Sequence, residues 1–104
     1  MAITPEQPEG ITNTMKKTGA SFKIIHDKNL EIMNMFGVRF TISDQLNERY
    51  KSKNIYVERN NGPNGPNLPV PATYIVNQDR RIVFGFYDPD YRNRATVGKI
   101  LENL

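Results

Sequence analysis

The sequence has no cysteine among its 104 residues. This absence excludes disulfide bonds, thiolate nucleophiles and zinc–thiolate sites, because each of them needs a cysteine sulfur. There is one histidine, His26, and only its neighbour Asp27 stands close to it as a second metal-ligand type. A lone histidine is more often structural than catalytic. We therefore expect no catalytic residue, no metal site and no cofactor in this chain.

Long apolar runs are also missing. A membrane-spanning helix needs about 18 or more consecutive apolar residues, and the sequence has no such run. The first residues, Met1 to Glu6, show neither a basic leader nor the apolar core of a signal peptide. These observations favour a cytoplasmic protein that has no membrane partner.

Blocks of like charge are absent as well, although the formal net charge is +3. The lysines and arginines are scattered along the chain, whereas nucleic-acid-binding proteins gather them on one face or in one segment. A solvated surface is the simpler reading of this charge. Binding to nucleic acid is a minor alternative.

The length is enough for one small domain, since domains rarely fall below about 50 residues. Hydrophobic residues make up 38% of the chain, which places it among globular proteins and not among disordered ones. We expect one domain over residues 1–104. The methionines at 15, 33 and 35 are expected to fill gaps in its core.

The first half of the chain is predicted to alternate strands and helices. Proline and glycine mark the ends of these elements, because proline cannot continue a ladder and glycine adopts the left-handed conformation that closes a helix. The expected elements are a strand over 2–4, a helix over 9–18 that stops at Gly19, a strand over 22–27, a helix over 29–36 capped by Asp27 and closed by Gly37, an extended segment over 38–42, and a helical turn opened by Ser43 or Asp44.

Residues 59–67 consist almost entirely of asparagine, glycine and proline. Glycine supplies positive φ, proline fixes φ, and asparagine tolerates left-handed geometry, so this composition is typical of turns. We predict an exposed loop over 59–67.

The second half is predicted to be a hairpin followed by a helix. Two β-rich segments, 72–76 and 81–86, flank the polar residues 77–80, which is the pattern of a β-hairpin. Thr96 can cap the following helix, whose apolar residues recur at 97, 100, 101 and 104, a spacing that predicts an amphipathic helix lying on a sheet. The sequence therefore indicates a mixed α/β fold.

Two motifs carry a family resemblance. They are Leu68-Pro69-Val70-Pro71-Ala72-Thr73-Tyr74-Ile75-Val76-Asn77 and Asp88-Pro89-Asp90-Tyr91-Arg92-Asn93-Arg94. Together with the order of the elements, they resemble the redoxin group of the alkyl hydroperoxide reductase and thiol-specific antioxidant family. The resemblance spans nearly the whole chain but begins in the middle of the family domain. It implies a truncated thioredoxin-like fold, with a mixed sheet, flanking helices and a C-terminal hairpin and helix.

The resemblance also implies which residues matter. Pro71 stands where thioredoxin-like proteins have a cis-proline, so we expect a cis peptide bond before it. Thr73 belongs to the first motif, as Pro71 does. The second motif contributes Asp88, Asp90, Tyr91 and Arg94. Either these four residues form a binding cluster, with a carboxylate paired to a guanidinium, or they form a turn that fixes the entry of the last helix, and we favour the turn.

The family's cysteine-bearing strand and helix have no counterpart in this sequence. Peroxiredoxins also have an arginine ahead of the hairpin, where this chain has Pro69, Val70 and Pro71. We therefore expect a domain derived from a thiol-dependent antioxidant oxidoreductase that performs no thiol redox chemistry by itself. The missing strand would leave edges unpaired, which predicts a homo-oligomer or a partner that supplies the strand. The alternative function is a non-catalytic protein-interaction module.

Overall fold

The computed structural model describes all residues from Met1 to Leu104. The fold is mixed α/β, and its six strands form three separate two-stranded sheets. The chain divides into two compact units, Met1–Pro69 and Val70–Leu104, and each is described by itself. No helix is both long and apolar enough to cross a membrane.

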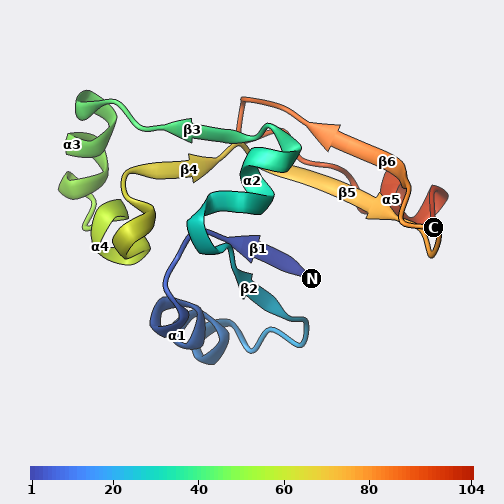
Figure 1. Ribbon diagram of the computed structural model, residues 1–104, viewed down its shortest axis with the longest axis horizontal. Helices are drawn as coiled ribbons and strands as arrows, with labels where there is room; N and C mark the ends of the chain where they lie inside the picture. The colour runs from blue at the N-terminus through green and yellow to red at the C-terminus, as the bar shows by residue number, and fades with distance from the viewer. The chain divides into compact units, whose positions relative to one another are not determined.

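The first unit opens with a parallel pair joined through a helix (Figure 1). Strand β1 (Ala2–Thr4) pairs with β2 (Ile24–His26), and α1 (Pro8–Thr18) lies between them in the chain. Gly19 ends α1 in the left-handed conformation, with φ of 64°. The predicted strand over 2–4 and the helix that stops at Gly19 are confirmed.

The next helix is reached through a strained turn. Residues Lys28–Leu30 form the 3-10 turn η1, in which both Asn29 and Leu30 have φ of 59°, and α2 (Glu31–Phe36) follows. A positive φ is unusual for leucine, whose bulky side chain crowds the backbone there. Asp27 caps α2 as predicted, since its carboxylate accepts from the backbone N–H groups of Ile32 and Met33, both at 2.9 Å.

The rest of the first unit contains a second strand pair and two helices. Strand β3 (Arg39–Thr41) lies antiparallel to β4 (Asn67–Pro69), with Phe40 opposite Leu68. Between them come α3 (Asp44–Ser52), α4 (Val57–Asn61) and the 3-10 turn η2 (Gly62–Asn64). Ser43 caps α3 by accepting from the N–H of Leu46, as the sequence predicted.

The prediction that residues 59–67 form an exposed loop holds only for part of the segment. Asn61, Asn64 and Asn67 are only 1%, 7% and 7% exposed. The segment ends α4, forms η2 and begins β4, and these three asparagines are buried while Arg59, Asn60, Gly62 and Pro63 stay exposed. Gly62 and Gly65 have positive φ, as the turn composition predicts, but the amide side chains point inward and hydrogen-bond the backbone.

The second unit is a hairpin and one short helix. Strand β5 (Ala72–Val76) pairs antiparallel with β6 (Ile82–Tyr87), with an irregularity between Ile75 and Val76, and α5 (Val97–Glu102) follows. The hairpin is confirmed, and Thr96 caps α5 by accepting from the N–H of Lys99 at 3.1 Å. No peptide bond in the chain is cis, so the expectation of a cis bond before Pro71 is wrong.

The buried apolar residues all lie in the first unit: Ile11, Leu30, Met33, Val38, Ile42 and Val57. Of the three methionines expected in the core, only Met33 is buried, because Met15 and Met35 are 37% and 77% exposed. No residue from Val70 to Leu104 is buried, and α5 does not bury its apolar face.

Candidate functional site

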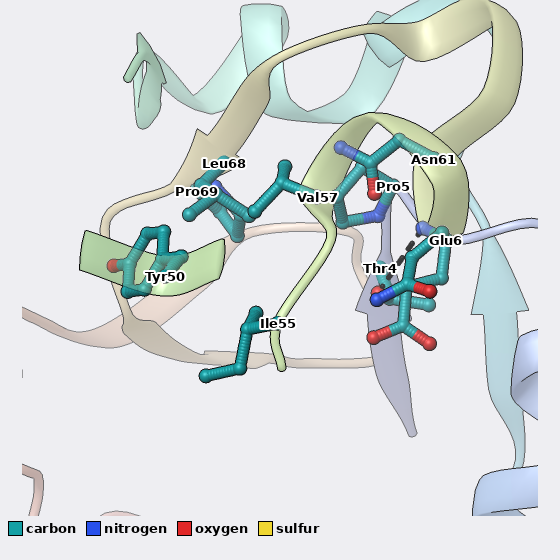
Figure 2. A pocket seen from close by; sticks show the side chains of 10 residues that line it. Thr4, Pro5, Glu6, Tyr50, Ile55, Val57, Asn61, Leu68 and Pro69 are labelled. Carbon is teal, nitrogen blue, oxygen red and sulfur yellow. Dashed lines mark hydrogen bonds between the residues drawn. The ribbon is translucent and has the colours of Figure 1, made fainter. Parts of the chain in front are cut away.

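A pocket of about 300 Å³ lies where β1 ends (Figure 2). In open α/β folds, ligands bind beyond the carboxyl ends of parallel strands, and Thr4 is the last residue of parallel strand β1. The lining residues come from both ends of the first unit: Thr4, Pro5, Glu6, Tyr50, Ile55, Val57, Asn60, Asn61, Leu68 and Pro69. This position makes the pocket the candidate site of the first unit.

The lining is apolar on the side formed by Tyr50, Ile55 and Leu68 and polar on the side formed by Thr4 and Glu6 (Figure 2). Ligand sites typically combine an apolar wall with a few polar groups in about 300–1,000 Å³. General acid–base catalysis needs a positioned proton donor and acceptor beside the reacting atom. A single carboxylate, that of Glu6, is present here, so the arrangement suits binding better than catalysis.

His26 supports the rim of this pocket from β2. Its Nδ1 donates to the backbone carbonyl oxygen of Glu6 across 2.7 Å. The bond joins the end of β2 to the segment that follows β1, and His26 does not line the pocket. Its role in this structure is the structural one that the sequence favoured.

A buried amide network adjoins the pocket, since Asn61 belongs to both. The Nδ2 of Asn64 donates to the carbonyl oxygens of Pro5 at 2.9 Å and Asp27 at 3.0 Å. The Nδ2 of Asn61 donates to the carbonyl oxygens of Gly65 at 2.9 Å and Asn67 at 2.7 Å. Buried carbonyl groups without a partner would cost free energy, and these two side chains supply donors to four backbone acceptors, three of them through fully buried bonds.

The third asparagine connects the network to the β3–β4 pair. Asn67 donates from Nδ2 to the carbonyl oxygen of Asn64 at 2.8 Å. Its Oδ1 accepts from the Thr41 hydroxyl at 2.7 Å and from Nε of Arg39 at 3.3 Å. The contacts with Thr41 and Arg39 join β4 to β3 through side chains far apart in sequence. The turn composition of 59–67 was the only sequence signal for them.

The second motif forms a compact turn of its own. Asp88 accepts from the N–H of Asp90 at 2.8 Å and from Nδ2 of Asn93 at 3.0 Å. Arg94 donates to the carbonyl oxygen of Tyr91 at 2.7 Å, and the Tyr91 side chain is exposed. The four residues lie together, but the last helix is capped by Thr96.

The carboxylate–guanidinium pair of this turn joins Asp90 to Arg92. Their atoms Oδ2 and Nη2 are 2.9 Å apart. Hydrogen bonds from the Arg92 side chain, and then from its backbone N–H, hold the pKa of Asp90 below its ordinary value, and the same side-chain bond raises the pKa of Arg92. Both groups are exposed, so the pair orders the turn more than it stabilises the fold.

The first motif is divided between the two units. Leu68 and Pro69 belong to β4, while Thr73 lies in β5 opposite Phe86 of β6, and Pro71 immediately precedes β5.

No group of three or more histidine, cysteine, aspartate or glutamate side chains is arranged to hold a metal ion.

Comparison of the chain with family models, curated proteins and solved structures found no match in any of the three.

Proposed function

We propose that this chain is the cysteine-free part of a thioredoxin-like redoxin domain and that it acts as a non-catalytic binding scaffold. The scaffold binds through the β5–β6 hairpin and α5. In the family that the sequence resembles, the corresponding elements belong to a thiol-dependent antioxidant oxidoreductase. The cytoplasmic location expected from the sequence stays a prediction.

The arrangement of the elements supports the redoxin part of the proposal. The first motif runs into β5, the second follows β6, and α5 comes last, which is the order that the resemblance implies. The parallel β1–α1–β2 unit at the start is also of the kind found in α/β folds. Since β1 pairs only with β2 and β5 only with β6, both strands have an edge available for a further strand.

One observation carries the binding part of the proposal: the second unit has no buried residue. Val76 and Ile82 of the hairpin are each 53% exposed, and Leu101 of α5 is 62% exposed. A polypeptide below about 40 residues rarely buries enough surface to be stable alone, and an isolated hairpin is marginal in water. The unit therefore needs another surface to cover its apolar side chains.

For the purified chain, the proposed occupant of this surface is a second copy. An edge strand presents unpaired N–H and C=O groups, and two copies of one edge can pair antiparallel about a two-fold axis. The apolar faces of the two α5 helices would be covered by the same association. A segment that carries the family's cysteines would compete for the same surface.

The test is the molar mass in solution, measured by multi-angle light scattering over a range of concentrations, beside a thiol-coupled peroxide-reduction assay. The expected result is a dimer or larger species that does not turn over peroxide. A monomer at every concentration, with one cooperative unfolding transition, would overturn the proposed binding surface. Peroxide turnover by the pure chain would overturn the non-catalytic assignment.

A further inference from the structure

The buried network contains two asparagines that are each followed by glycine. These are Asn61–Gly62 and Asn64–Gly65, three residues apart in sequence. We infer that the two pairs form a spontaneous modification site, which is closed in the folded first unit and opens on unfolding. Deamidation there converts a chain that has opened into one that no longer refolds.

The reaction requires only water. The glycine backbone nitrogen loses its proton and attacks Cγ of the preceding asparagine, and a bond forms between that nitrogen and Cγ. The Cγ–Nδ2 bond breaks, and Nδ2 leaves as ammonia after taking up the proton. Water then opens the resulting five-membered imide at either carbonyl carbon and leaves aspartate or isoaspartate. Glycine favours the attack because it has no Cβ and moves freely in backbone torsion space.

The folded structure blocks both reacting groups. The attacking nitrogens are engaged as donors, since the N–H of Gly62 bonds to the carbonyl oxygen of Glu58 and that of Gly65 to the carbonyl oxygen of Gly62 at 2.9 Å. The leaving amides are buried, with Asn61 at 1% and Asn64 at 7% exposure. Each Nδ2 also donates two hydrogen bonds of 2.7–3.0 Å. Attack therefore requires the segment to open first.

The product does not fit the site that the amide leaves. A carboxylate at position 61 would face the carbonyl oxygens of Gly65 and Asn67, and one at position 64 would face those of Pro5 and Asp27. A carboxylate has no proton to donate, so all four acceptors lose their amide donor, and a charge is buried without a counter-ion. The carbonyl oxygens of Gly65 and Asp27 keep only the backbone N–H groups of Asn67 and Leu30. Isoaspartate also inserts one more carbon into the main chain.

The first experiment compares deamidation in the folded and the unfolded full-length chain. The protein is incubated in mildly alkaline buffer with and without urea, and peptide mass mapping follows the exchange of NH₂ for oxygen at positions 61 and 64. We expect conversion to be at least about a hundredfold slower in the folded chain, which corresponds to an opening free energy of about 3 kcal/mol. Equal rates in the two buffers would overturn the inference.

A variant identifies the reacting nitrogen. In urea, Gly65→Ala should convert at Asn61 at the original rate and at Asn64 much more slowly, because the added methyl group hinders attack only at the second pair. Folding plays no part in this comparison. Unchanged conversion at Asn64 would mean that the residue 65 nitrogen is not the attacking group.

The last step tests whether modified chains refold. After ageing in alkaline urea, the chains are diluted into native buffer and their unfolding transition is recorded. A matched sample aged in acidic urea, where the glycine nitrogen keeps its proton, should recover its full transition. The alkaline sample should lose amplitude in proportion to its converted fraction. Full recovery by the converted chains would overturn the inference.

Discussion

The Nδ2 of Asn64 lies 2.9 Å from the carbonyl oxygen of Pro5, across 59 positions of sequence. The same nitrogen reaches the carbonyl oxygen of Asp27 at 3.0 Å. One side chain therefore joins the ends of β1 and β2 to the turn η2. The contact therefore holds Pro5, one of the residues that line the pocket, against the interior of the first unit.

Asn64→Ala should destabilise the first unit. The substitution removes the amide donor from the carbonyl oxygen of Pro5 and leaves that of Asp27 with only the N–H of Leu30 at 3.2 Å. A buried acceptor that loses its donor costs about 1–3 kcal/mol. The free energy of unfolding from urea titration measures the effect. Asn103→Ala is the matched control, because Asn103 also donates to a carbonyl oxygen, that of Lys99, but at an exposed position. The control should stay within about 0.5 kcal/mol of the parent, and equal losses in the two variants would contradict the role of Asn64.

The burial of Asn61, Asn64 and Asn67 also shows where sequence reasoning failed. Turn rules describe which backbone conformations a residue tolerates, and η2 and Gly65, with φ of 67°, agree with them. Those rules do not say whether an amide side chain faces water or a distant carbonyl. For Asn64 that choice depends on Pro5 and Asp27, which lie far away in sequence.

Sequence patterns predicted the structure correctly where the stabilising hydrogen bond joins residues that are close in sequence. The stop at Gly19, the cap at Ser43 and the cap at Thr96 each involve neighbours within four residues, and all three are present. Strand β4 was missed because it pairs with β3 across a long separation and contains Pro69. The pocket could not be predicted, since its walls come from segments at both ends of the first unit.

Asp27→Ala should cost more than Ser43→Ala, although both residues cap helices. Asp27 is 2% exposed and accepts two backbone N–H groups, whereas Ser43 accepts one at an exposed site. Loss of an exposed cap typically costs about 1 kcal/mol. Loss of the buried Asp27 carboxylate also leaves the N–H of Met33 without an acceptor. It removes the hydrogen bonds that hold the positive-φ turn at Asn29 and Leu30 as well. Urea titrations of the two variants give the comparison, and an equal or reversed order would show that burial adds nothing to the cap.

Arg92→Ala should raise the pKa of Asp90 toward its ordinary value of 3.8. The guanidinium hydrogen bond favours the charged carboxylate, so the folded pKa lies below the unfolded one. The stabilisation is therefore present above the unfolded pKa and is lost as the pH falls through the lowered folded pKa. Carbon-detected NMR titration of the Asp90 carboxyl carbon in the parent chain and in the variant measures the shift. A pKa that does not move in the variant would contradict this pairing.

Leu101→Lys should weaken self-association if α5 contacts a second copy. Leu101 is 62% exposed in the single chain, so the lysine costs little there, but in an association it would bury a charge against the apolar face of the partner. Asn103→Lys adds the same charge one residue beyond α5, away from the apolar stripe, and serves as the control. Light scattering should show the dimer dissociating at a higher concentration for Leu101→Lys than for Asn103→Lys. If the dimers of the two variants dissociate at the same concentration, the added charge weakens the association and the apolar face of α5 is not part of the interface.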